Sequence, residues 1–433
     1  MKFTLTNSIT ATYLLFFAMN IATAQGFITI SDQKFIKNNQ PYYFIGTNFW
    51  YGMNLAAEKS GNRERLIREL DRLKALGINN LRIMAGSEGP DDAPWRIKPA
   101  LQPELGIYNQ DLLQGLDFLF DEMRKREMYA VVCLNNFWPW SGGMAQYVNW
   151  YEISDIPYPP PAENGSWSKY QFYTARFYKD KNAQEAFNKH IKKIVGRTNS
   201  YSGIQYKHDP AIMAWQLANE PRGILSKKAF NKWIDKTARL IKSLDNNHLL
   251  TVGSEGKTHT SFTGNQVKKN HRSQYIDYMT IHIWVQNWEW YHPNNAEESL
   301  IYAKEKAENY IKKHIEFAQK LKMPLVLEEF GISRDLDNHS PKSPVSVRDN
   351  YYEFIFDKVI DYATKDTPMA GCNFWAWGGE GRPAEPKTIW KEGDDFIGDP
   401  PHEYQGWYSV YDTDKSTLNV ISSAIEKVNN INK

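Results

Sequence analysis

Residues 211–221 read AIMAWQLANEP, an apolar run of strand length that ends in the polar pair Asn219 and Glu220. Similar apolar runs, bounded by turn residues, recur at about 42–50, 79–86, 129–135, 211–218, 249–254, 278–284, 324–330 and 369–377. Short continuous apolar runs are typical of parallel strands that are buried on both faces. The sequence therefore contains eight candidate parallel strands.

Amphipathic segments of helical period lie between most of these runs. They cover Arg63–Leu76, Gln110–Arg126, Ala183–Gly196, Lys228–Leu244, Ala303–Leu321, Arg348–Ala363 and Leu418–Val428. The connection around Gly264–Gln274 has little helical character. Strands that alternate with helices predict a parallel α/β sheet, and eight such units close a (β/α)8 TIM barrel.

The rival architecture is an open doubly wound sheet, in which a Gly-rich turn typically follows the first strand. The segment FIGTNFW at Phe44–Trp50 is not such a turn, so we favour the barrel. Residues 27–41 predict a short N-terminal β-hairpin before the first barrel strand, placed to plug the barrel floor. Residues 25–433 are then one barrel with long βα loops rather than several domains.

The first 24 residues have the pattern of a secretory signal peptide. Lys2 precedes an apolar run over about Ala11–Ala22, and Ala22-Thr23-Ala24 is a small-x-small cleavage site. We expect cleavage near Ala24, a single catalytic domain over 25–433, and a secreted or periplasmic protein with no membrane attachment. Its two cysteines, Cys133 and Cys372, are expected to be buried free thiols.

The charge balance excludes one class of partner. Lys plus Arg number 52 and Asp plus Glu number 50, which gives a net charge of +2. Proteins that bind nucleic acids usually have an excess of basic residues, and this nearly neutral chain has no such excess. We therefore expect no nucleic acid partner, and we expect a monomer.

Function in a barrel lies at the carboxyl ends of the strands and in the loops that follow. Glu220 and Glu329 follow apolar strand patterns, where an ionised carboxylate is costly without partners. Two carboxylates facing each other across a cleft are the groups that glycoside hydrolysis requires. The alternative is that both are ordinary strand-end residues that cap loops.

Two cationic candidates accompany these carboxylates. Arg82 lies inside an apolar run and needs an anion; pairing with Glu329 would keep that carboxylate ionised, as a nucleophile requires. A purely structural salt bridge is the alternative for Arg82. His282 is a candidate base, a substrate ligand or a satisfied core histidine.

Tryptophan is unusually abundant, with 15 residues in a chain that is 14% aromatic. In the predicted topology most of them lie at a strand end or in the loop after it, namely Trp50, Trp95, Trp138, Trp140, Trp150, Trp167, Trp284, Trp288, Trp290, Trp375, Trp377, Trp390 and Trp407. If the tryptophans only filled the core, they would not gather at the carboxyl-end rim of the barrel. Flat amphipathic rings stack on the apolar faces of pyranose sugars, so this rim suits a polysaccharide cleft, with about half of its Trp residues structural.

These residues resemble glycoside hydrolase family 5, a family of retaining (β/α)8 glycosidases. Asn219-Glu220-Pro221 is followed about a hundred residues later by Glu329-Phe330-Gly331. Arg82, His282 and Trp375 fall where that family keeps other active-site residues. The ordered set extends over nearly the whole mature chain.

A narrower resemblance is to the endo-β-1,4-mannanases of subfamily 7. It is carried by the segments Gly46–Trp50, Asn135–Trp138 with Ser141–Gly143, Asn219–Arg222, Ser254–Gly256 and Gly406–Asp412. The substrate would be a mannan, glucomannan or galactomannan. The rivals are a β-1,4-glucanase of the same family and a non-catalytic polysaccharide-binding barrel.

The resemblance implies Glu220 as the acid/base and Glu329 as the nucleophile, with no metal or organic cofactor needed. The field of Glu329 is expected to help keep Glu220 protonated. The other implied roles are Asn219 at the sugar 2-hydroxyl, Arg82 holding the nucleophile, Trp375 as the sugar platform, Arg222 and Glu255 on the leaving-group side, and Asn136 and Trp138 along the cleft.

Three features of the sequence lead to specific expectations about the site. The family usually has Tyr two residues after the histidine that corresponds to His282, whereas this chain has Trp284, so the tyrosine contact to the nucleophile must change or be supplied elsewhere. The long loop over about Asn136–Lys181 is expected to build extra cleft wall. Glu328, next to Glu329 on the strand, is expected to point to the other face.

Overall fold

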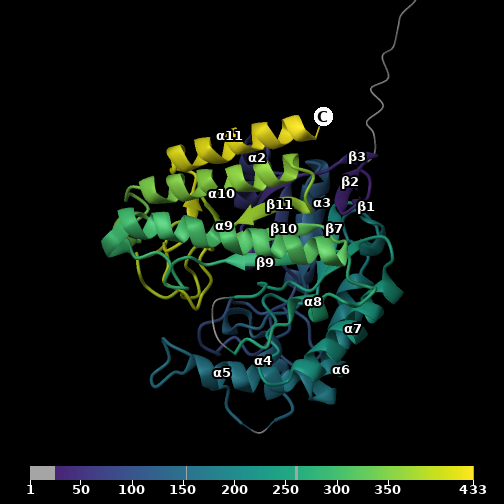
Figure 1. The fold of residues 1–433 in the computed structure, drawn as a ribbon. Helices are drawn as coiled ribbons and strands as arrows, with labels where there is room; N and C mark the ends of the chain where they lie inside the picture. Colours follow the sequence, from purple (N-terminus) through teal and green to yellow (C-terminus); the bar gives the residue numbers. More distant parts are fainter. Residues whose placement is uncertain (1–24, 153, 259–261, 433) are drawn as a thin grey trace, which may run out of the picture.

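The computed structural model describes residues 25–152, 154–258 and 262–432 (Figure 1). Its main sheet has eight strands in the order β8-β7-β6-β5-β4-β11-β10-β9, and each paired neighbour runs parallel. The strands are β4 Phe44–Asn48, β5 Asn80–Met84, β6 Tyr129–Cys133, β7 Ile212–Gln216, β8 Leu249–Thr251, β9 Met279–Ile283, β10 Leu325–Phe330 and β11 Met369–Phe374. A parallel bridge between Thr251 and Tyr278 joins β8 to the start of β9 and closes the barrel. The predicted (β/α)8 barrel is confirmed.

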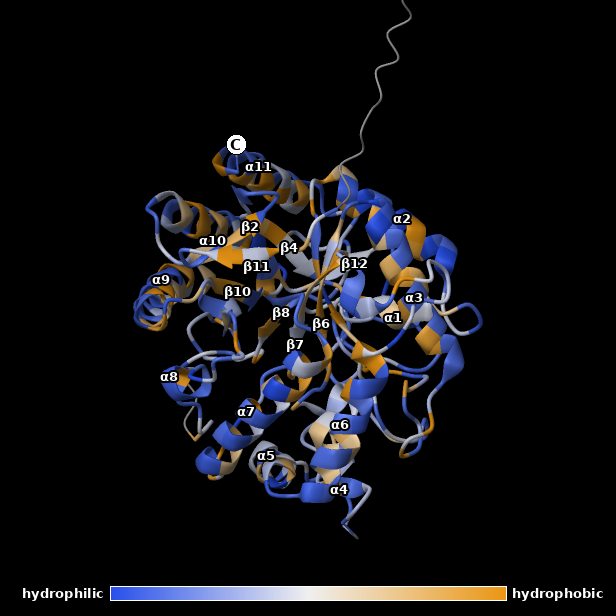
Figure 2. Ribbon diagram, turned by 90° about the vertical axis from the view of Figure 1, so that its right-hand side faces the viewer, coloured by the Kyte–Doolittle hydropathy of each residue, from blue (hydrophilic) through white to orange (hydrophobic). Residues whose placement is uncertain are grey.

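Helices surround the strands, and Figure 2 shows them as an outer ring. They are α2 Arg63–Ala75, α3 Gln110–Lys125, α6 Lys181–Val195, α7 Lys227–Leu244, α8 Val267–Asn270, α9 Ala296–Leu321, α10 Ser346–Thr364 and α11 Lys415–Ile431. Seven of these match the amphipathic segments in the sequence. The weak connection around Gly264–Gln274 holds only the single short turn α8 among its described residues.

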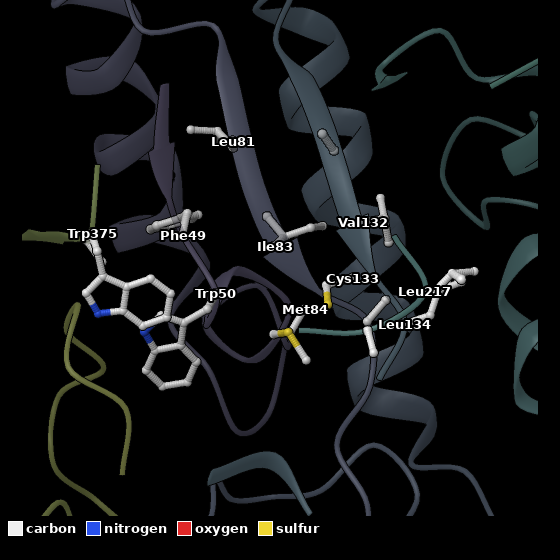
Figure 3. Close-up of a cluster of buried hydrophobic side chains, with 14 of the residues drawn as sticks. Phe49, Trp50, Leu81, Ile83, Met84, Val132, Cys133, Leu134, Leu217 and Trp375 are labelled. Atoms are coloured by element: carbon white, nitrogen blue, oxygen red, sulfur yellow. The ribbon is translucent and has the colours of Figure 1, made fainter. Parts of the chain in front are cut away.

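Apolar side chains fill the layer between the strands and the helices. Leu81 and Ile83 on β5 and Val132 on β6 belong to this cluster, and Figure 3 shows them with Trp50 and Trp375 at one end. Alternation along a strand sends one set of side chains to this layer and the other into the barrel. The strands therefore have no solvent-facing side, which explains their continuous apolar runs.

The N-terminal segment closes the bottom of the barrel. Strands β1 Thr29–Ser31 and β2 Lys34–Lys37 form the predicted hairpin, and β3 Gln40–Pro41 adds a third short strand that was not expected. Phe35 on β2 packs against Phe44 and Tyr278 at the barrel floor. The hairpin thus plugs the end of the barrel opposite the strand termini that carry the candidate site.

Two connections contain structure of their own. Helices α4 Gly143–Asn149 and α5 Trp167–Thr174 lie between β6 and α6. After β11, strand β12 Trp377–Gly379 pairs with β13 Val410–Tyr411, and a long loop separates them. A short helix, α1 Gly52–Leu55, follows β4.

Cys133 and Cys372 are free and buried, as predicted. None of the helices in the described part of the chain is long and apolar enough to cross a membrane. The predicted signal peptide, residues 1–24, lies outside the described residues.

Candidate active site

Glu220, His282 and Glu329 meet at the carboxyl-end mouth of the barrel. Glu220 follows β7, His282 lies on β9 and Glu329 lies on β10. One ligand-type atom from each side chain lies within 4.8 Å of the others. All three residues are buried. The two glutamates predicted to form a pair are therefore brought together, with an imidazole between them.

Glu329 is bound directly by Arg82, whose Nη1 donates to Glu329 Oε1. Arg82 also donates to Asn48 Oδ1 at 3.0 Å and to Asn219 Oδ1 at 2.7 Å. Burial alone would lower the pKa of the guanidinium, but Glu328 and Glu329 outweigh it and raise the pKa. Arg82 is thus a permanent, rigidly held cation against the Glu329 carboxylate.

Glu220 has an unusual backbone and two strong donors. Its φ of 47° lies in the left-handed region, which non-glycine residues rarely occupy and which often marks functional positions. Trp138 Nε1 donates to Glu220 Oε2 at 2.6 Å, and His282 Nδ1 donates to Glu220 Oε1 at 2.5 Å. Burial opposes ionisation, but His282, Arg222 and Trp138 more than offset it and lower the pKa of Glu220.

The lowered pKa of Glu220 differs from the expectation that the field of Glu329 helps keep Glu220 protonated. His282 stands between the two glutamates, and its Nδ1 is also 3.2 Å from Glu329 Oε2. Burial disfavours the imidazolium, but Glu329, Glu220 and Glu328 raise the pKa of His282 well above its usual value. In the free protein the proton shared by His282 and Glu220 therefore resides mainly on the imidazole.

The expectation that Glu328 points to the other face is wrong. Glu328 Oε2 accepts from Gln216 Nε2 at 2.5 Å and lies 3.4 Å from Arg82 Nε. The pairing of β10 with β9 shifts register between Leu327 and Glu329, so strict alternation breaks at this point. Both neighbouring glutamates consequently face the barrel interior.

Arg222 and Glu255 form a buried pair beside Glu220. Two guanidinium nitrogens of Arg222 donate to the two oxygens of Glu255 at 2.6 and 2.7 Å. The guanidinium also lies 4.7 Å from the ring of Trp138. Burial is the main cause that raises the pKa of Glu255 to about 7, against the opposing effect of Arg222.

An open cleft of about 560 Å³ lies above these groups. The tryptophans that line it are Trp138, Trp140, Trp167, Trp284, Trp288, Trp375 and Trp407. Trp138, Trp140 and Trp167 come from the connection after β6, which builds extra cleft wall as predicted. Other rim tryptophans are structural: Trp50 donates to Gly398 O at 2.8 Å and Trp377 to Glu69 at 3.0 Å.

Trp284 occupies the place where the family usually has Tyr. Its indole packs edge-on against Trp375, with ring centroids 5.7 Å apart. Arg82 and His282 supply the polar contacts of Glu329 instead. Arg82 and His282, which lie below the cleft, therefore contact Glu329 in place of the tyrosine.

Six of the predicted substrate-binding residues line the cleft, namely Trp138, Asn219, Arg222, Glu255, Trp284 and Trp375. The other three, Arg82, Asn136 and His282, do not line it. Asn136 is fully buried; its Oδ1 accepts from Trp138 N at 3.0 Å and from Asn219 Nδ2 at 3.2 Å. These three residues support the residues that line the cleft.

Sequence reasoning missed the contribution of the loop between β12 and β13. Glu403 lines the cleft and is half-buried, and its buried Oε2 atom has no hydrogen-bond partner among the described residues. Burial, reinforced by Asp399 and the two site glutamates, raises the pKa of Glu403 well above its usual value. His402 beside it donates to Pro160 O at 2.7 Å. No strand pattern precedes these residues, so the sequence carried no signal for them.

Glu220, His282 and Glu329 are also residue types that bind metal ions. However, His282 Nδ1 faces both carboxylates as a hydrogen-bond donor and the Arg82 guanidinium contacts Glu329. Two cations thus already neutralise these carboxylates. The arrangement is suited to holding and moving a proton.

Comparisons with known proteins agree with this geometry. A family model described as glycoside hydrolase family 5 β-mannosidase-like matches residues 25–433. Mannan endo-1,4-β-mannosidase 1 of Solanum lycopersicum is 33% identical over 377 residues, which cover 84% of this chain and 86% of the relative. The crystal structure of a family 5 mannosidase from Rhizomucor miehei is 37% identical with a TM-score of 0.87, and the match covers 95% of this chain and 99% of that one. A mutant of this mannosidase in complex with mannosyl-fructose matches with a TM-score of 0.86 at 37% identity, over 94% of this chain and 98% of that one. The chain therefore belongs to the β-mannosidase-like group of glycoside hydrolase family 5.

Proposed function

We propose that this protein is a retaining endo-β-1,4-mannanase that hydrolyses mannan, glucomannan or galactomannan. The observation that carries the proposal is the buried pair Glu220 and Glu329 beneath a tryptophan-lined cleft. Retaining glycosidases hold their carboxyl groups about 5–5.5 Å apart and inverting ones about 6.5–9.5 Å. One oxygen of Glu220 lies within 4.8 Å of one oxygen of Glu329, which favours the shorter spacing of the retaining class.

In the first step Glu329 attacks the anomeric carbon and the glycosidic bond breaks. The leaving oxygen takes a proton from Glu220, which shares its proton with His282 across 2.5 Å. The product of this step is a glycosyl ester on Glu329. In the second step Glu220 accepts a proton from water, and the resulting hydroxide displaces Glu329 with net retention.

The cleft residues supply substrate contacts. Trp375 offers an indole face for the sugar at the cleavage point, and Asn219, held by Arg82, is available to the 2-hydroxyl. Arg222 and Glu255 lie beside Glu220, where the leaving group departs. Their buried polar groups suit the hydroxyls of a neighbouring sugar.

The proposal includes the domain organisation, the oligomeric state and the export of the protein. Residues 25–433 would form a single catalytic domain that acts as a monomer after export and removal of residues 1–24. N-terminal sequencing of the exported protein and its elution volume on size exclusion check these points.

A substrate panel tests the proposal. The purified protein is incubated with linear mannan, glucomannan, galactomannan and carboxymethylcellulose, and reducing ends are measured. We expect release from the mannans and none from carboxymethylcellulose. Release from carboxymethylcellulose alone would identify a β-1,4-glucanase. Binding to mannan without any release would identify a non-catalytic binding protein.

A second candidate, a β-mannosidase that works from chain ends, is favoured by a contact between two loops. Pro160 in the connection after β6 accepts a hydrogen bond from His402 in the loop after β12, and His402 packs edge-on against Trp167. In the barrel β6 is separated from β11 by β5 and β4. The two loops therefore meet over the β4–β5 side of the mouth and form a wall across that end of the cleft.

Product size separates the two modes of action. An endo enzyme lowers the viscosity of galactomannan early and releases oligosaccharides of mixed length. A chain-end enzyme releases mannose from mannohexaose from the first time point and leaves the viscosity nearly unchanged. Mannose as the sole early product would replace the endo proposal with the chain-end one.

Replacing Trp138 with phenylalanine is expected to move the pH profile. The substitution removes the indole donor to Glu220 and keeps an aromatic ring. A hydrogen bond to a charged group contributes about 1.5–3 kcal/mol, and about 1.4 kcal/mol corresponds to one pKa unit. Ionised Glu220 loses stabilisation, so the basic limb of kcat/KM should move to higher pH by about one unit. Trp233→Phe, a buried tryptophan on α7, is the matched control, and an unmoved limb in Trp138→Phe would contradict the assignment.

A further inference from the structure

Two consecutive glutamates of β10 face the barrel interior, and the proposed reaction uses only one of them. Glu328 is 1% exposed, deeper than the cleft surface, and does not line the cleft. A buried carboxylate is costly unless charges or donors compensate it. Its position therefore requires an explanation from its partners.

Glu328 Oε2 lies close to three nitrogen atoms. Gln216 Nε2 donates to it at 2.5 Å, the Arg82 guanidinium forms an ion pair with it through Nε at 3.4 Å, and His282 Nε2 lies at 3.5 Å. Gln216 is itself oriented, because its Oε1 accepts from Arg82 Nε at 2.9 Å. A main-chain bond also holds the residue in place, since Asn48 Nδ2 donates to Glu328 O at 2.9 Å.

The imidazole of His282 therefore contacts carboxylates through both nitrogens. Nε2 faces Glu328, and Nδ1 faces Glu220 and Glu329. A carboxylate at one ring nitrogen fixes which nitrogen carries a proton and how the ring is oriented. With acceptors on both sides, the ring is held as a doubly protonated cation.

We propose that Glu328 is a positioning residue that holds the His282 imidazolium against Glu220 and Glu329 and so maintains the proton that Glu220 delivers to the leaving group. This proposal deepens the proposed function and rests on it. Glu328 contacts neither the cleft nor the reacting atoms and acts through His282. Its charge raises the proton affinity of the His282–Glu220 pair.

The charged groups around His282 come from four strands. Arg82 is on β5, Glu220 follows β7, Glu255 follows β8, and Glu328 and Glu329 are on β10. Neutralising one anion of this set lowers the affinity of the pair for its proton. Loss of the Glu328 charge should therefore let the pair lose its proton at lower pH.

A structural role makes a different prediction. If Glu328 served only as a counter-charge to Arg82, its loss would lower activity equally at every pH, because arginine does not deprotonate in proteins. A shift of the basic limb therefore reports on His282. The two roles are separated by the pH profile of kcat/KM and not by the loss of activity itself.

The experiment compares Glu328→Gln with Glu328→Asp and with the control Glu88→Gln. Burial raises the pKa of Glu88 to about 8, so glutamine is a close substitute there at neutral pH, and Glu88 touches none of these site residues. In Glu328→Gln the basic limb on mannohexaose should move to lower pH by about one to three units, the usual effect of one nearby charge. Glu328→Asp keeps the charge and should recover most of the shift. Equal shifts in both variants, or none, would overturn the proposal.

A second measurement does not need turnover. Protein labelled with ¹⁵N-histidine shows the protonation state of each imidazole by NMR, and His282→Gln identifies the signal. The His282 ring should remain doubly protonated at pH 8 in the original protein and lose this state in Glu328→Gln. An unchanged His282 signal overturns the proposal even if the protein hydrolyses mannan. A changed signal supports it even if the natural substrate is another polysaccharide.

Discussion

Glu329→Ala is expected to lower kcat on mannan by about 10⁴-fold or more, the scale seen when a nucleophile is removed. The carboxylate that Arg82 holds beneath the cleft is the only nucleophile in the proposed mechanism. Without it no glycosyl ester forms, and weakening of substrate binding is not expected. The checks are kcat/KM on linear mannan and the affinity for mannohexaose, which should stay close to that of the original protein.

Azide provides the control for this variant. Azide can enter the space left by the carboxylate and attack the anomeric carbon from the same side, which gives an α-mannosyl azide from an activated aryl β-mannoside. Glu329→Gln keeps the volume of the side chain and should be inactive with azide. Full activity of either variant without azide would refute the nucleophile assignment.

Glu220→Ala is expected to lower kcat/KM on mannan by about 10²–10⁴-fold, the usual contribution of general acid–base catalysis. The loss should be small for formation of the glycosyl ester from a dinitrophenyl β-mannoside, because that leaving group needs no proton. The ester should then accumulate, since no base activates water. A burst of dinitrophenol followed by slow turnover is the measurement.

Azide again tests the geometry. In Glu220→Ala it replaces water in the second step, so the product should be a β-mannosyl azide, opposite in configuration to that from the Glu329 variant. The same configuration from both variants would mean that the two roles are not divided as proposed. Thermal unfolding of each variant shows whether the fold is kept.

The barrel could be predicted from the sequence because its strands are buried on both faces. Runs such as that ending at Glu220 carry no alternation, and a helix of clear period follows most of them. The barrel topology alone places the side chains at the strand ends around one mouth, which is why the sequence predicts that Glu220, His282 and Glu329 lie together. The connection around α8 has little helical character in the sequence, and its helix α8 has only four residues in the structure.

Local geometry was harder to predict than topology. The inward side chain of Glu328 depends on a shift in the pairing of two strands, which no single-strand pattern encodes. Asn136 was expected along the cleft because of its position in a motif, but its side chain turns down to hold Trp138 and Asn219. Glu403 and His402 come from a loop without regular structure, and their position depends on contacts with another loop.

Because Glu220, His282 and Glu329 lie so close together, the charge on Glu329 affects whether Glu220 acts as an acid or as a base. Formation of the glycosyl ester consumes the negative charge of Glu329, and the positive charge of the neighbouring imidazole is then balanced by fewer anions. The affinity of Glu220 for a proton then falls, so Glu220 stays deprotonated after it has protonated the leaving group and is ready to take a proton from water in the second step. The same side chain can therefore serve as donor and then as acceptor while the fold stays still, because the covalent state of one carboxylate sets the protonation of the other.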